Sequence, residues 1–272
     1  LRLRLYEWGQ KGQPVVLILH GWLDQAFSWS EVAEELASNG YHVLAYDHRG
    51  HGRSAHIPAF DEYHFPDYIS DLQELIEEEG VEDFILLGHS MGGTIASLYS
   101  ALCSKAPKQL ILVDGVGTRH NSEQQATERY RIHLRQRRER KKHRPMASVQ
   151  EAAQRLQRNH PYLSGQRAQE LALRTVKKLE QGWEWSWDVR HRNRSAVGFH
   201  LPRFLDVLAN ISTPTHLIFG ANSWYVQQAD LPQRIKALSA VQRQIQLDTG
   251  HSPHLEHPRL LVASILDILE QK

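Results

Sequence analysis

Short apolar runs alternate with segments of helical spacing along most of the chain. Strand-like patterns occur at 1–5, 15–19, 42–46, 84–87, 109–113, 215–219 and 243–247. Between them, apolar residues recur every three or four positions, which predicts helices over 28–38, 66–79, 94–103, 229–239 and 258–270. Runs that are apolar throughout are typical of strands buried on both faces. The pattern therefore predicts an α/β fold, with a mostly parallel central sheet and helices on both of its faces.

One long segment interrupts this alternation. Residues 119–200 are polar, rich in arginine and mostly helix-forming, with breaks at Pro145, Pro161 and Gly182. They contain 19 Lys and Arg against 8 Asp and Glu, whereas the rest of the chain contains 13 and 23. The shift in charge marks a segment of different character. We predict a core domain made of residues 1–117 and 201–272, with a helical cap inserted at 118–200.

The length and composition are those of an ordinary globular protein. The 272 residues suffice for one large core with an insertion, and no apolar run approaches the roughly 18 residues that cross a membrane. The single cysteine, Cys103, forms no internal disulfide, so we expect a reducing, cytoplasmic location. The chain does not start with Met, so an N-terminal leader that has been removed is an alternative to the cytoplasmic location. The sequence does not decide between a monomer and a homodimer.

The stretch 84–93 (FILLGHSMGG) places a serine between an apolar run and a helical segment. Its form is G-x-S-x-G, the nucleophile elbow. A sharp turn would hold Ser90 in a strained backbone conformation, and side chains at Gly88 or Gly92 would collide with the neighbouring strand and helix. The positive end of the following helix would face the reaction centre. The pattern predicts that Ser90 is a nucleophile.

A serine nucleophile needs a base and a carboxylate, and both follow predicted strands. The carboxyl ends of parallel strands meet at one edge of the sheet, where His20, Ser90, Asp114 and His251 all fall. The order Ser, acid, His assigns the base to His251 and the acid to Asp114. Asp114 as a turn cap and Asp248 as the acid are the alternatives.

Two backbone N–H groups are the expected donors to the oxyanion that forms in acyl transfer. One is the N–H of Met91, the residue after the nucleophile. The other is the N–H of Trp22, because His20 and Gly21 allow the preceding loop to turn toward Ser90.

These motifs resemble the α/β-hydrolase superfamily along the whole chain. The matching stretches are 20–22 (HGW), 50–54 (GHGRS), 88–93 (GHSMGG) and 250–251 (GH). Residues 21–24, 110–114 and 190–192 are similar, more narrowly, to the serine hydrolase-like proteins of carboxylesterase type. The resemblance implies an α/β-hydrolase fold with a helical cap inserted after the strand that ends at Asp114.

The chain departs from this superfamily at one position. The acid there commonly follows the strand 215–219 in the form G-x-x-D, but Ser223 stands in its place, and the nearest acid, Asp230, belongs to the next helix. Some members, including a group of haloalkane dehalogenases, carry the acid after the earlier strand, where Asp114 lies. A serine nucleophile argues against dehalogenase and epoxide hydrolase chemistry, because those enzymes use an aspartate at that position.

The expected reaction is hydrolysis of carboxylic esters with short to medium acyl chains through an acyl-enzyme. A C–C bond hydrolase, a perhydrolase and a non-catalytic binding protein with this fold are the alternatives. We expect no cofactor and no metal, since the histidines lack a ligand spacing such as H-E-x-x-H.

The basic stretch 129–144 is the remaining feature of the predicted cap. Arg and Lys interleaved with Glu are typical of a solvated helix face, so no nucleic-acid partner is expected, and attraction of an anionic substrate is a second hypothesis. The tryptophans at 183, 185 and 187 could line an acyl pocket or anchor the cap to the core.

Overall fold

The computed structural model describes residues 1–59, 61–119, 126–139 and 141–270. Within them, a seven-stranded sheet has the order β1-β3-β2-β4-β5-β8-β9. Its strands are β1 (Arg4–Trp8), β2 (Val15–Leu19), β3 (His42–Asp47), β4 (Phe84–His89), β5 (Gln109–Val113), β8 (Thr215–Gly220) and β9 (Val241–Leu247). β1 pairs antiparallel with β3, and the other neighbours pair parallel, so the predicted mostly parallel sheet is confirmed.

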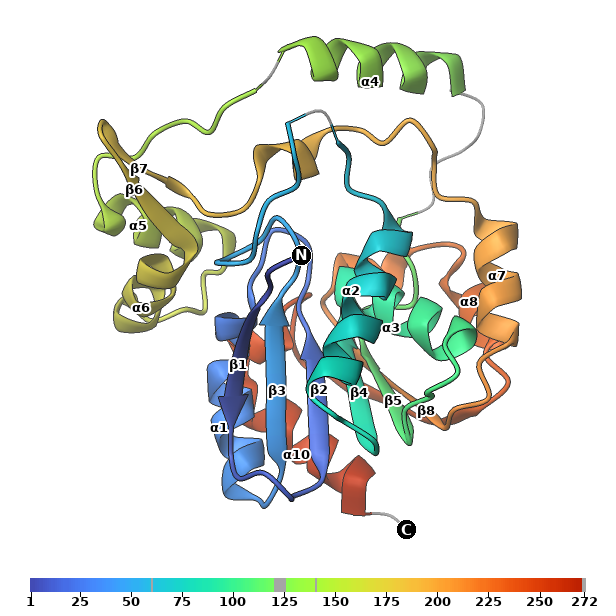
Figure 1. Cartoon of the computed structure of the whole chain (residues 1–272). Helices are drawn as coiled ribbons and strands as arrows, with labels where there is room; N and C mark the ends of the chain where they lie inside the picture. Colours follow the sequence, from blue (N-terminus) through green and yellow to red (C-terminus); the bar gives the residue numbers. More distant parts are fainter. Residues whose placement is uncertain (60, 120–125, 140, 271–272) are drawn as a thin grey trace.

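Helices cover both faces of the sheet (Figure 1). The helices on one face are η1 (Ala26–Trp29), α1 (Ser30–Ser38) and α10 (Pro258–Glu270). Those on the other are α2 (Phe65–Glu78), α3 (Met91–Leu102), α7 (Leu201–Ala209) and α8 (Leu231–Ala237). Successive residues of one strand enter different clusters: Leu17 packs with α2 and α3, whereas Val16 and Ile18 pack with α1 and α10. This double burial explains why the central strands are apolar at every position.

The segment between β5 and α7 forms a mainly helical cap. Its elements are α4 (Ala126–Glu139), α5 (Val149–Asn159), α6 (Gly165–Thr175), β6 (Val176–Leu179), β7 (Gly182–Trp185) and η3 (Val189–Arg192). Figure 1 shows α4 lying across the top of the molecule, away from α5 and α6. Residues 120–125 and 140 of the predicted cap lie outside the described residues, and its limits at 118 and 200 stay a prediction.

The β6–β7 hairpin was not predicted within the helical cap. Trp183 exchanges two backbone hydrogen bonds with Met146, of 2.7 and 2.8 Å, which extends the hairpin by one bridge. Trp183 and Trp185 pack against the cap's own apolar cluster around Met146 and Leu171. The alternation Trp-Glu-Trp was therefore a strand signal of period two, too short to outweigh the helix-forming composition around it. Helix α7 was also not predicted.

Among the described residues, no helix combines the length and apolar character needed to cross a bilayer.

Candidate active site

Ser90 occupies the turn between β4 and α3 with φ 53° and ψ −113°, a left-handed conformation rare for a residue with a side chain. The flanking glycines make the turn sterically feasible. A Cβ added at Gly88 would lie 2.5 Å from the carbonyl oxygen of Gly92, and one added at Gly92 would overlap the Leu19 carbonyl of β2. The predicted tight turn is present, and its strain is held by the packing of α3 against β2 and β4.

His251 lies between Ser90 and Asp114. Its Nε2 is 3.0 Å from Ser90 Oγ, and its Nδ1 is 3.1 Å from Asp114 Oδ2. Asp114 is fully buried, and its Oδ1 accepts a 3.1 Å hydrogen bond from the Gly220 N–H. With the Nδ1 proton on the Asp114 side, Nε2 is left as the acceptor for the serine proton. The structure thus brings together three side chains that the sequence places on three different loops.

The alternative acids lie elsewhere. Asp248 Oδ1 accepts a 2.8 Å hydrogen bond from the Asn222 side chain, and Asp230 pairs with Arg234 at 2.6 Å.

Ser223 approaches the same ring nitrogen as Asp114. Its Oγ is 3.4 Å from His251 Nδ1 and also accepts a 3.0 Å hydrogen bond from the Tyr225 N–H. The loop after β8 therefore reaches the histidine, but it presents a hydroxyl where a carboxylate would carry charge. Asp114 from β5 and Ser223 from β8 converge on one atom.

Two residues that the sequence analysis did not single out hold the His251 loop. Glu256, at the end of α9 (Pro253–Glu256), accepts hydrogen bonds from the Gly250 N–H at 2.6 Å and the Ser252 N–H at 3.2 Å. His89 Nε2 donates to the His251 carbonyl at 2.7 Å. These bonds fix the backbone on both sides of the imidazole. In the sequence, the only sign of this role is that Glu256 follows His251 by five residues, and a glutamate at that spacing commonly makes no such contact.

The two residues expected to supply oxyanion donors, Trp22 and Met91, belong to the loop after β2 and to the start of α3. Met91 begins α3, where the first N–H groups have no partner within the helix. A Cβ added at Gly21 would lie 3.4 Å from Ser90 Cβ, so the chain just before Trp22 runs close to the serine. Trp22 and Met91 line the same cavity as Ser90. Their role as donors stays a prediction.

Four further histidines form a cluster of neighbouring rings and are buried or nearly so: His20, His48, His51 and His191. Burial lowers the pKa of His51 to about 4 and that of His191 to about 2, and it holds the pKa values of His20 and His48 well below the ordinary value. All four rings are therefore neutral at pH 7. His51 Nε2, as an acceptor, takes a 3.2 Å hydrogen bond from the Leu23 N–H and so orders the loop next to Trp22.

These neutral rings predict that the protein loses stability in mild acid. The unfolded chain binds protons at histidine near pH 6.5, whereas the folded protein does so only below about 4 at His51 and about 2 at His191. As pH falls from 6.5 toward 4, the unfolded state therefore takes up more protons and gains free energy relative to the folded state. We expect the free energy of unfolding to fall by roughly 2 kcal/mol or more between pH 7 and pH 5, measured by urea denaturation.

Asp47 opposes this trend, because burial raises its pKa to about 6 and the folded state holds its proton longer. The four histidines together lower the free energy of unfolding by more than the one carboxyl raises it, so the net effect of acid is destabilising. Substitution His51→Gln should make the dependence on pH shallower, and a stability independent of pH between 7 and 5 would contradict the assignment of neutral rings.

One group of described residues has the composition of a metal site. Potential ligand atoms of Asp24, His89 and His254 all lie within 4.8 Å of one another. Both ring nitrogens of His254 are buried; Nε2 lies 3.4 Å from Asp24 Oδ2, Nδ1 has no hydrogen-bond partner among the described residues, and the ring stacks on Trp29 at 4.2 Å. Nothing in the proposed reaction requires a metal at this position.

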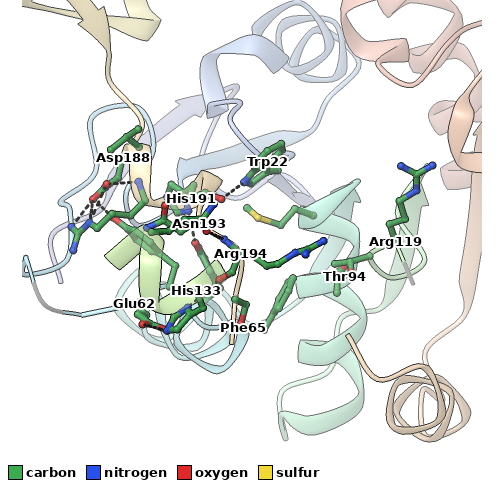
Figure 2. Close-up of a pocket in the computed structure, with 18 of the residues that line it drawn as sticks. Trp22, Glu62, Phe65, Thr94, Arg119, His133, Asp188, His191, Asn193 and Arg194 are labelled. Atoms are coloured by element: carbon green, nitrogen blue, oxygen red, sulfur yellow. Dashed lines mark hydrogen bonds and ion pairs between the residues drawn. The ribbon is translucent and has the colours of Figure 1, made fainter. Parts of the chain in front are cut away.

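A cavity of about 790 Å³ separates Ser90 from α4 of the cap. Its apolar lining comes mainly from the core and includes Trp22, Phe65, Tyr68, Met91, Trp224 and Tyr225. The polar lining comes largely from the cap and from the loop before α2 (Figure 2). The cavity has the size of many small-molecule sites. The three cap tryptophans do not line it, so the acyl-pocket interpretation for them is wrong.

Comparisons with known proteins agree with this architecture. The family described as alpha/beta hydrolase fold matches residues 14–258. A serine hydrolase-like protein of Danio rerio is 27% identical over 98% of this chain and 85% of its own length. A thioesterase domain from the curacin biosynthetic pathway has 32% sequence identity and a TM-score of 0.86, covering 97% of this chain and 94% of that chain. A hypothetical protein of Pseudomonas aeruginosa PAO1 has 26% identity and a TM-score of 0.88, over 99% and 96%.

The match over most of the chain, together with the sheet order and the cap, shows that this protein belongs to the α/β-hydrolase fold family.

Proposed function

We propose that the protein is a serine hydrolase that cleaves carboxylic esters through a covalent acyl-enzyme. The observation that carries the proposal is His251, with Nε2 3.0 Å from Ser90 Oγ and Nδ1 3.1 Å from Asp114 Oδ2. A nucleophile, a base and an orienting carboxylate within hydrogen-bond reach are the geometry that acyl transfer requires. The position of the three side chains beside a cavity of ligand size supports the same reaction.

In the first half-reaction, Ser90 Oγ attacks the ester carbonyl carbon while its proton passes to His251 Nε2. Asp114 stabilises the resulting imidazolium through its contact with Nδ1. The carbonyl oxygen becomes an oxyanion, for which we propose the N–H groups of Met91 and Trp22 as donors. Collapse breaks the bond to the alcohol, which leaves with the proton from Nε2, and the acyl group stays on Ser90.

In the second half-reaction, water attacks the acyl-enzyme. His251 Nε2 accepts the proton of this water and returns it to Ser90 Oγ as the acid is released. The apolar lining formed by Trp22, Phe65 and Met91 supports an acyl group of short to medium length.

A thioester is the second candidate substrate, because the curacin thioesterase domain is similar over 97% of this chain. The steps are the same, with a thiol leaving in place of the alcohol. Comparing butyryl thioesters with butyryl oxygen esters of equal acyl length separates the two.

The test of the proposal combines p-nitrophenyl butyrate hydrolysis with labelling by a fluorophosphonate probe. We expect wild-type protein to turn over the ester and to become covalently labelled at Ser90, because the probe reacts with activated serines. A protein that neither hydrolyses the ester nor reacts with the probe would be the non-catalytic binding protein of the same fold.

A further inference from the structure

Charged side chains of the cavity fall into two groups. Five cationic side chains line it, and three of them have carboxylate partners: Arg137 with Glu62 at 2.6 Å, Arg190 with Asp188 at 2.6 Å, and Lys141 with Glu139 at 3.7 Å. The guanidinium groups of Arg119 and Arg194 have no carboxylate partner among the described residues. Of the acidic lining residues, Asp61 lies beside Arg190, whose Nη1 donates to the Asp61 carbonyl at 3.4 Å.

Hydrogen bonds to α4 fix the main chain of Arg194, and the Arg194 side chain lines the cavity. Its N–H donates to Gln136 Oε1 at 2.7 Å, and its carbonyl accepts from His133 Nδ1 at 3.0 Å. Both partners belong to α4. Figure 2 shows the Arg194 side chain extending across the cavity toward Thr94, near the start of α3. The buried Thr94 hydroxyl also has no partner among the described residues.

Arg119 adds positive charge on the side of the cavity near His251. Its guanidinium lies 5.8 Å from the centre of the Trp224 ring, and that ring is 4.8 Å from the ring of His251. A cation–π contact orients a guanidinium without neutralising its charge. The cavity is therefore apolar beside the serine, and among the described residues it carries two cations without a carboxylate partner, the half-buried Arg194 and the exposed Arg119.

We propose that the substrate of this hydrolase is an anionic ester, with a carboxylate or phosphate group that Arg194 and Arg119 bind. The proposal rests on the proposed function and assigns the substrate class of the same site. A guanidinium presents parallel N–H groups that match two oxygens of a carboxylate or phosphate. Arg194 is half-buried, so it gains more from binding such a group than the exposed Arg119 does. Neutral esters of equal size lack this contact.

The experiment uses two pairs of substrates whose members differ in one anionic group. The first pair is monoethyl adipate and diethyl adipate, and the second is 1-butyrylglycerol 3-phosphate and 1-butyrylglycerol. The measured quantity is the ratio of kcat/KM for the charged member to that for the neutral member. We expect wild type to favour the charged member of at least one pair, and the pair it favours tells a carboxylate from a phosphate.

Arg194→Gln keeps most of the side-chain stem and removes the charge. We expect it to lower that ratio by about 10- to 100-fold, mainly through a higher KM for the charged ester. Arg194→Lys should recover part of the ratio. The matched control is Arg138→Gln, a change of equal charge at an exposed position of α4 outside the cavity, which should leave the ratio unchanged.

The outcomes separate this proposal from the proposed function. If the probe labels Ser90 but wild type shows no preference for the charged esters, or Arg194→Gln and Arg138→Gln act alike, the anion site is wrong and the hydrolase stands. If the probe does not label the protein, the hydrolase fails. Calorimetric titration of wild type and Arg194→Gln with adipate and with inorganic phosphate then decides the anion site alone, since only a true site loses affinity in the variant.

Discussion

Replacing Ser90 by alanine is expected to lower kcat for p-nitrophenyl butyrate by about 10⁴- to 10⁶-fold. The substitution removes the atom that forms the acyl-enzyme, and His251 Nε2 loses the donor that lies 3.0 Å away. Initial rates measured at saturating ester give the effect directly.

Ser97→Ala is the matched control for this variant. Ser97 is a buried serine of α3, the helix that follows Ser90; its hydroxyl donates to the Gly93 carbonyl at 2.8 Å, and it does not line the cavity. Its loss should leave kcat near the wild-type value. Retention of more than a tenth of the activity in Ser90→Ala would show that another group is the nucleophile.

Replacing Asp114 by asparagine should lower kcat by about 10⁴-fold. The amide cannot stabilise the imidazolium, and it favours the tautomer with the proton on Nε2, which no longer accepts from serine. Initial rates for Asp114→Asn and Asp248→Asn, measured side by side, provide the comparison, because Asp248 bonds Asn222 and not the histidine. If Asp114→Asn keeps near-wild-type activity, the acid is another residue.

The convergence of Asp114 and Ser223 on His251 Nδ1 allows a sharper version of this test. We expect Ser223→Asp to restore activity in the Asp114→Asn protein by about 10²-fold or more, since the residue at 223 already reaches to 3.4 Å from the ring. The single variant Ser223→Asp is the control for damage to the loop. Without any recovery in the double variant, the loop after β8 is not equivalent to the position of Asp114.

The sequence predicted the sheet and the meeting of Ser90, Asp114 and His251 because both follow from local rules. Buried strands are apolar at successive positions, and parallel strands bring their carboxyl ends to one edge. The glycines beside Ser90 are required by direct backbone contacts, so they could be interpreted without knowing the rest of the fold.

Other parts of the site depend on contacts between distant segments, and no local pattern encodes them. Glu256 matters because its carboxylate meets the N–H groups of Gly250 and Ser252, which depends on the angle at which α9 leaves the loop. Arg194 faces the cavity because α4 holds its main chain. Trp183 and Trp185 face the cap's own cluster because a four-residue strand happens to pair there.

The two helices that face each other across the cavity, α4 of the cap and α3 of the core, are held by different kinds of interaction. Among the described residues of α4, His133 is the buried side chain. Polar contacts fasten the helix: His133 and Arg137 contact Glu62 at 3.0 and 2.6 Å, and two hydrogen bonds join α4 to the Arg194 main chain. Such contacts bury little apolar surface, whereas α3 below packs into the main core. We therefore expect α4 to open locally at a small fraction of the global unfolding free energy, so that its amides exchange early in a hydrogen-exchange experiment. High salt should lower this opening free energy further, because it screens the ion pairs. Exchange of bulky reactants and products with solvent then requires no disturbance of the sheet that positions the serine.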